Sequence, residues 1–197
     1  SGTVAAGLTT YQKAHLVFVL PHSVITVSIV TALLPALSRV AHSGNLRQVG
    51  LDIGTTMRMV AMLIVPVSAV LILLGPQISV LLFGYGAATA AQAGLMGVIV
   101  SLFVLGLLPF TLFYVLLRGF YSLEDTKTPF WVTVAFNVVY LALAIPLFEY
   151  FLSGGQQVAM LALSYSIAYW LVFILTWALL HRRLGTVDTA RTVKMLL

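Results

Sequence analysis

The first long apolar run of the chain carries a stripe of polar side chains that could bind a polar or charged group within a membrane. At about 100° per residue, Tyr11, His15, His22 and Thr26 fall within about 60° of one another on a helical wheel. Ionisable groups in apolar helices are costly and commonly mark binding or transport sites. A protonated imidazole can meet an anion, and a neutral one can still donate a hydrogen bond. The stripe is therefore expected to face protein or a water-filled cavity, with both histidines toward the substrate path.

A purely structural role is the alternative reading of these residues. His15 and His22 could bond neighbouring helices, and Lys13 could extend its ammonium group to the outer membrane interface. We take four residues as the candidate substrate-binding set: His15, His22, Tyr11 and Lys13. Pro21 lies between the two histidines, where it removes a backbone hydrogen bond and should bend the helix.

Patterns for catalysis or metal binding are missing from the sequence. The chain has no cysteine, which excludes disulfides and thiolate metal sites. Among its five acidic residues only Glu124 and Asp125 are neighbours, in a turn where Thr126 or Thr128 should cap the next helix. Asp125 and Thr128 flank the entry to that helix, where unpaired N–H groups need acceptors. No histidines have metal-ligand spacing, and no nucleic-acid-binding motif occurs. We therefore expect a protein that is not an enzyme, with no catalytic residue, no metal, no cofactor and no nucleic-acid partner.

The elements that must position the stripe are membrane-spanning helices. Hydrophobic residues make up 61% of the 197 residues and charged residues 8%, with a mean hydropathy of +1.09. The apolar runs do not alternate with period two, which favours helices over a closed barrel. We predict an all-α, polytopic membrane bundle over residues 1–185. Its five or so transmembrane helices are expected at about 5–41, 46–74, 89–118, 129–151 and 156–182, with breaks at Gly75-Pro76 and Gly84-Tyr85-Gly86.

The basic residues predict the orientation of the bundle. With five spans, nine of the ten Lys and Arg residues fall on one side, and such a bias marks the cytoplasmic face. Residues 43–56 and 119–127 are then cytoplasmic, and residues 76–88 and 152–156 external. The C-terminus is cytoplasmic, with residues 186–197 forming a tail or the start of a further amphipathic helix. An odd number of spans with an external start indicates a piece of a longer chain.

Three strings, in order, resemble the MurJ/MviN family of lipid II flippases, within the multidrug/oligosaccharidyl-lipid/polysaccharide exporter superfamily. They are LPHSVITVSIVTALLPALSRVAHSGN (20–45), VPVSAVLILLGPQISVLLFGYGAAT (65–89) and RGFYSLEDTKTPF (118–130). The resemblance covers residues 1–150 well and the last helix loosely. It implies that the chain supplies the eighth to twelfth of fourteen transmembrane helices, most of the second of two lobes.

The resemblance also implies a function. Such a protein translocates lipid II, the lipid-linked precursor of the peptidoglycan cell wall, across the bacterial cytoplasmic membrane by alternating access. Its partners would be lipid II, membrane lipid and the missing N-terminal lobe of the same chain. Alternatives are an exporter of another lipid-linked polysaccharide or of drugs, or a non-transporting membrane scaffold or fragment.

One departure from the family concerns its cavity-lining arginine. That arginine occurs in a pattern like A-D-R-x-x-x-x-P in the helix that resembles the first helix here. Alignment on Pro21 places the acidic position at His15 and the arginine at Leu16. His15 or Lys13 is then the candidate to replace the arginine.

Overall fold

The computed structural model describes residues 2–83, 90–150 and 154–185, and within these ranges the chain is helical, with no strand. The elements are α1 (Gly2–Pro21), the π-helix η1 (His22–Thr26), α2 (Val27–His42), α3 (Leu46–Phe83), α4 (Ala90–Val104), α5 (Leu107–Ser122), α6 (Lys127–Tyr150) and α7 (Gly154–Leu184). This confirms the predicted all-α class. The turn at Gly84-Tyr85-Gly86 and the tail 186–197 lie outside the described residues.

The helices are long and apolar enough to form a membrane bundle. Four stretches pass this test singly: Gly7–His42, Leu46–Leu81, Lys127–Tyr150 and Gln156–Leu184. A fifth candidate span is the pair Gly94–Val104 and Leu107–Ser122, whose two halves meet at 40°. Up to five spans agree with the predicted number of about five.

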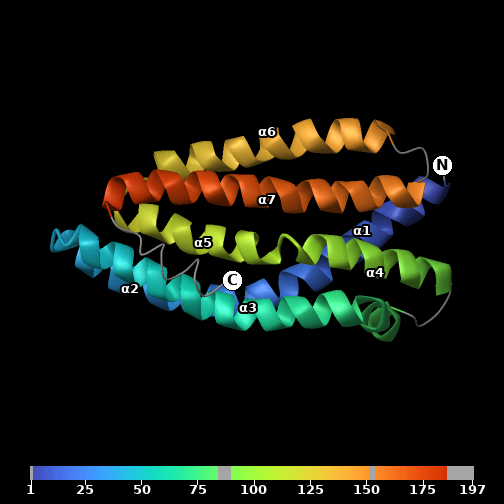
Figure 1. Ribbon diagram of the computed structural model, residues 1–197, viewed down its shortest axis with the longest axis horizontal. Helices are drawn as coiled ribbons and strands as arrows, with labels where there is room; N and C mark the ends of the chain where they lie inside the picture. Colours follow the sequence, from blue (N-terminus) through green and yellow to red (C-terminus); the bar gives the residue numbers. More distant parts are fainter. Residues whose placement is uncertain (1, 84–89, 151–153, 186–197) are drawn as a thin grey trace.

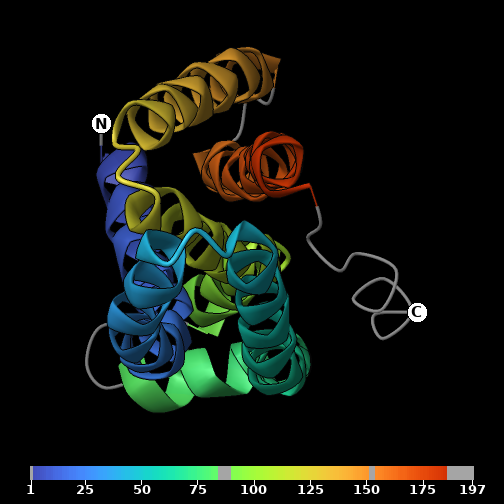
Figure 2. The ribbon, with the colours of Figure 1, turned by 90° about the vertical axis from the view of Figure 1, so that its left-hand side faces the viewer.

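The helices lie side by side along one long axis (Figure 1). Seen from the end of that axis, α6 lies at one margin of the bundle and packs mainly on α7 (Figure 2). α4 and α5 lie deeper, where they contact α1, α2, α3 and α7. The fully buried side chains of Phe18, Phe103 and Phe120 show where these elements meet.

The first span is one helical path whose hydrogen-bond register changes in the middle. Pro21 has no N–H and its ring disfavours regular α-helix geometry around it. Directly after it the backbone runs for five residues as a π-helix, and the Val27 N–H donates to the His22 carbonyl. The predicted bend at Pro21 thus takes the form of a local widening, a feature often found at functional sites.

The second span continues through the predicted break. α3 passes Gly75 and Pro76 and ends at Phe83. One lost hydrogen bond is tolerated here because α4 covers the proline closely: a Cβ added at Gly97 would lie 2.7 Å from Pro76 Cα. Small residues on facing membrane helices permit such close packing.

The fourth and fifth elements form one broken span where a continuous helix was predicted. The break leaves carbonyls that no α-helical N–H can reach, and α7 supplies donors to them. Ser166 Oγ donates to the Leu102 carbonyl at 2.6 Å, and Trp170 Nε1 donates to the Leu105 carbonyl at 3.1 Å. Gly106 permits this contact, since a Cβ there would lie 2.7 Å from Ser166 Oγ.

Candidate functional site

The polar stripe of α1 lies against aromatic rings of α4 and α5. The ring of His15 lies 5.4 Å from that of Phe103, between centroids. About two turns later, the ring of His22 lies 4.4 Å from Phe110 and 4.8 Å from Tyr114, between centroids. Both histidines therefore point into the bundle.

Side chains of α6 and α7 cover the part of this cluster around Tyr11 and His15. His15 Nε2 lies 3.5 Å from the hydroxyl of Tyr165, and the hydroxyls of Tyr11 and Tyr140 are also 3.5 Å apart. The Tyr165 ring meets Tyr140 edge-on, at 5.8 Å between centroids. These long hydrogen bonds join α1 to both α6 and α7 through half-buried side chains.

The structure brings Tyr11, His15, His22 and Thr26 onto one face, but that face packs inside the bundle. His22 is 6% exposed and Thr26 fully buried, whereas Tyr11 and His15 are half-buried. The expectation that both histidines face the space between two lobes does not agree with this placement, because α4, α5 and α7 occupy that side. Lys13 is half-buried.

The opposite face of the same span is open and carries a stripe of apolar side chains. Leu16 is 63% exposed, and Leu20 and Val24 follow at four-residue intervals with similar exposure. Leu16 is the position at which the sequence comparison placed the arginine of the resembling family. The open face, not the histidine face, is thus available to a lipid, a cavity or a further part of the protein.

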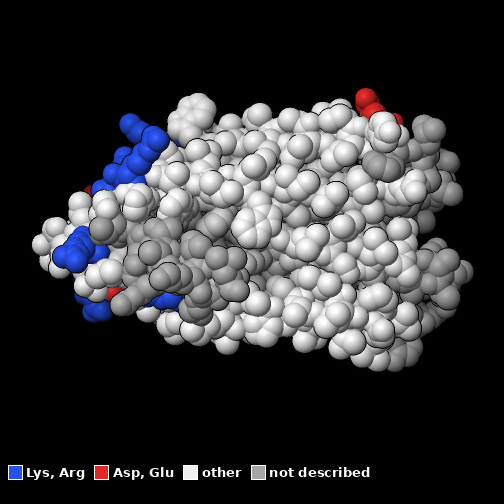
Figure 3. All heavy atoms as spheres, in the orientation of Figure 1, with Lys and Arg blue, Asp and Glu red and all other residues white. Residues whose placement is uncertain are grey.

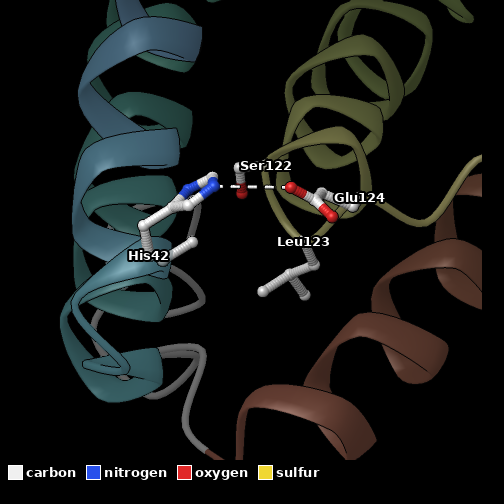
Figure 4. A pocket seen from close by; sticks show the side chains of 5 residues that line it. His42, Ser122, Leu123 and Glu124 are labelled. Carbon is white, nitrogen blue, oxygen red and sulfur yellow. Dashed lines mark ion pairs between the residues drawn. The ribbon is translucent and has the colours of Figure 1, made fainter.

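Charged residues gather at one end of the long axis. Figure 3 shows Lys and Arg at its left-hand end, where α2, α5 and α7 finish and α6 begins. There His42 of α2 meets Glu124 of the α5–α6 turn, with 3.4 Å between Nε2 and Oε1. The two side chains face each other across a shallow pocket of about 260 Å³ that Ser122 and Leu123 also line (Figure 4).

Asp125 organises the start of α6 at this end. Its carboxylate accepts hydrogen bonds from the backbone N–H groups of Lys127 and Thr128 and from the Thr128 hydroxyl, and it pairs with Arg183 at 2.7 Å. Burial tends to raise the pKa of the carboxyl, but the Thr128 bonds, the Arg183 charge and the Lys127 bond outweigh it and hold that pKa below its usual value. Asp125 is therefore the side-chain acceptor that caps α6. It was expected at this entry together with Thr128, whose hydroxyl donates to it.

The aromatic residues that surround the two histidines were not predicted from the sequence. Phe103, Phe110 and Tyr114 surround the histidines, yet they stand in a uniformly apolar run whose composition gives no sign of their partners. The break at Gly106 had a signal, a glycine three residues before Pro109. Among the described residues no group of three or more His, Asp or Glu side chains could hold a metal ion.

Comparisons with known proteins match nearly the whole chain. The sequence model of the family described as "Lipid II flippase MurJ" matches residues 3–197. A "Probable lipid II flippase MurJ" of Rhizobium tropici is 34% identical over 182 residues, 92% of this chain and 32% of that protein. One of Buchnera aphidicola subsp. Baizongia pistaciae is 32% identical over 151 residues, 77% of this chain and 28% of that protein.

A solved structure has the same fold. "Lipid II flippase MurJ, inward closed conformation" superposes with a TM-score of 0.75 at 22% identity, over 91% of this chain and 36% of that one. The chain thus spans about a third of the length of the proteins that it matches.

Proposed function

Because this chain belongs to the lipid II flippase MurJ family, we propose that it forms part of the second lobe of a transporter that moves lipid II across the bacterial cytoplasmic membrane. The family match over residues 3–197 carries this proposal. The apolar helical bundle, with up to five candidate membrane spans, supports a role in transport. The partners in this proposal are lipid II, membrane lipid and the remaining helices of the same protein.

The open face of α1 and α2 is the proposed wall of the substrate path. Leu16, Leu20 and Val24 present an unpartnered apolar stripe next to the break at Pro21, where a second lobe could approach. Tyr11, His15 and Lys13 lie at the rim of this wall, and their partial exposure leaves them able to reach a polar headgroup. His22 has too little exposed surface for a bulky substrate, so we do not assign it a substrate contact.

Transport by the full-length protein is the direct test. Purified full-length protein in vesicles should move a fluorescent lipid II analogue across the bilayer. An undecaprenyl-linked polysaccharide precursor and a lipophilic drug cation serve as competing cargoes. If either competitor moved and lipid II did not, the protein would be an exporter of that other cargo and the proposal would be wrong. Movement of none of the three would favour a scaffold.

The wall assignment is tested by restoring the family's residue. If Leu16 faces a polar path, Leu16→Arg should insert and fold like the parent and keep lipid II movement. If Leu16 faces hydrocarbon, the arginine should reduce the amount of folded protein, because a charge at the bilayer centre costs about 2.5–3.5 kcal/mol or more. Val17→Arg is the matched control, since the neighbouring Val17 is 3% exposed and packed; this variant should fail to fold.

A further inference from the structure

The π-helix holds two buried polar groups that the helix itself does not satisfy. Neither His22 Nδ1 nor Thr26 Oγ1 has a hydrogen-bond partner within the described part of the chain. Both side chains are more than nine-tenths buried. An unpaired buried polar group costs about 1–3 kcal/mol, so two such groups on adjacent turns call for a ligand.

The missing bond of Thr26 follows from the change of register. Thr31, Thr55 and Thr176 each donate their hydroxyl to the carbonyl four residues earlier. For Thr26 that carbonyl belongs to His22. In the π-helix it accepts the backbone N–H of Val27 in place of that of Thr26, and the Thr26 hydroxyl makes no bond to it. The widened turn therefore leaves the Thr26 hydroxyl without the bond to its own helix that other threonines make, and this hydroxyl belongs to the same π-helix as the His22 imidazole.

Two further polar side chains of α5 follow this pair in the direction of the basic end of the bundle. The Tyr114 ring lies 4.8 Å from the ring of His22. Arg118 follows one turn later on α5, with its guanidinium carbon 5.7 Å from the centroid of Tyr121. Tyr114 and Arg118 are half-buried, in contrast to their apolar neighbours in α5. Polar groups thus continue from the middle of the span toward the end where Lys and Arg gather.

From this arrangement we infer that His22 and Thr26 form a buried hydration site, supplied with water along Tyr114 and Arg118 from the basic end. Water fits because it can donate to one group and accept from the other, and buried waters typically bridge such pairs. A metal cation fits poorly, since residues 2–42 contain no carboxylate to balance its charge. A lipid headgroup is too large for two side chains with so little exposed surface.

Millisecond X-ray hydroxyl-radical labelling of the full-length protein in nanodiscs tests the site, with water itself as the probe. Bound water is radiolysed in place and oxidises the side chain beside it. We expect His22 to be oxidised several-fold more than Phe18, which is also buried, lies one turn earlier and has no polar atom of its own. Labelling of His22 no greater than that of Phe18 would overturn the inference.

Matched threonine variants separate hydration from general loosening of the bundle. Thr26→Val keeps the shape but removes the hydroxyl, and it should lower oxidation of His22, whereas Thr26→Ser should keep it. Thr176→Val should leave His22 labelling unchanged, because Thr176 is equally buried but bonds its own helix at 2.6 Å.

Thermal stability gives an independent test, because the melting temperature should change in opposite directions for a dry and for a hydrated Thr26 hydroxyl. A dry, unpaired hydroxyl replaced by methyl should raise the melting temperature of the protein, and a hydrated one should lower it. We expect Thr26→Val to lower it. A rise, or unchanged His22 labelling in this variant, would contradict the site.

Discussion

At the scale of single residues, Asp125 fixes the start of α6 with three hydrogen bonds and one ion pair. These partners leave its side chain only 9% exposed. Asp125→Ala should lower the free energy of unfolding by roughly 0.5–2 kcal/mol, the usual cost of removing a cap. Urea or thermal unfolding of the full-length protein measures it. Glu149→Ala is the control, since this exposed acid on the last turn of α6 should have little effect.

The same carboxyl predicts a dependence of stability on pH. Its pKa is lower in the folded protein than in the unfolded chain, so its contribution is complete above the ordinary pKa of an aspartate. The contribution is then lost as the pH falls through the lower, folded-state value. The stability difference between the parent and Asp125→Asn should therefore shrink on acidification below about pH 4. A difference that stayed constant to low pH would argue against the charged cap.

Glu124 adopts a backbone conformation that side chains with a branched Cβ avoid. Its φ is +58°, in the left-handed region. Asn tolerates this region, whereas Val does not, and both remove the exposed pairing with His42 equally. Glu124→Val should thus be less stable than Glu124→Asn by roughly 1 kcal/mol. Equal melting temperatures for the two variants would show that the turn relaxes.

The helix face on which the polar residues lie could be predicted from the sequence more easily than the side chains that surround them. The spacing of Tyr11, His15, His22 and Thr26 correctly placed them on one face, because helical periodicity is a local property. Which way that face turns depends on rings in α4, α5 and α7, about ninety to one hundred and fifty residues away. Phe103 and Tyr165 gave no local sign that they would lie against His15, so the surroundings of the stripe could not be predicted where long-range packing decides them.

At the scale of elements, the joint between α4 and α5 depends on Gly106 and on α7. Gly106→Ala would place a methyl group 2.7 Å from Ser166 Oγ and should destabilise the protein by roughly 1–3 kcal/mol. The control is Gly94→Ala in α4, where no atom lies within 4 Å. That variant should gain roughly 0.5–1 kcal/mol, because alanine is the better helix former. Thermal unfolding compares the two, and a loss of similar size at Gly94 would point to a general intolerance of α4.

Helix ends were the least predictable feature of the elements. A proline inside an apolar run can end a helix, widen it or pass through it, and the chain shows two of these outcomes: widening after Pro21 and continuation through Pro76. The outcome at Pro76 depends on whether a neighbour such as Gly97 can pack against the ring. That neighbour is set by the tertiary structure, so periodicity and composition alone could not decide between the outcomes.

At the scale of the whole molecule, the class of fold could be predicted because it follows from composition and from the charge pattern along the chain. Uncharged runs long enough to cross hydrocarbon leave few alternatives to a helical bundle. The Lys and Arg residues of separate loops do meet at one end of the described structure, as Figure 3 shows. The orientation of that end remains a proposal, which rests on the preference of basic loops for the cytoplasm.

Labelling from the two sides of the membrane decides the orientation. This chain has no native cysteine, so single cysteines can be placed at Ser43, between α2 and α3 at the basic end, and at Glu149, near the opposite end of α6. In the full-length protein, freed of any cysteine elsewhere, a membrane-impermeant maleimide added to intact cells should label Glu149→Cys only. Ser43→Cys should react once the membrane is opened. Both side chains are exposed, so reactivity reports sidedness and not burial. Labelling of Ser43→Cys from outside, with protection of Glu149→Cys, would show that the bundle has the opposite orientation. The basic loops cannot move to the other face of the membrane unless every span between them moves as well.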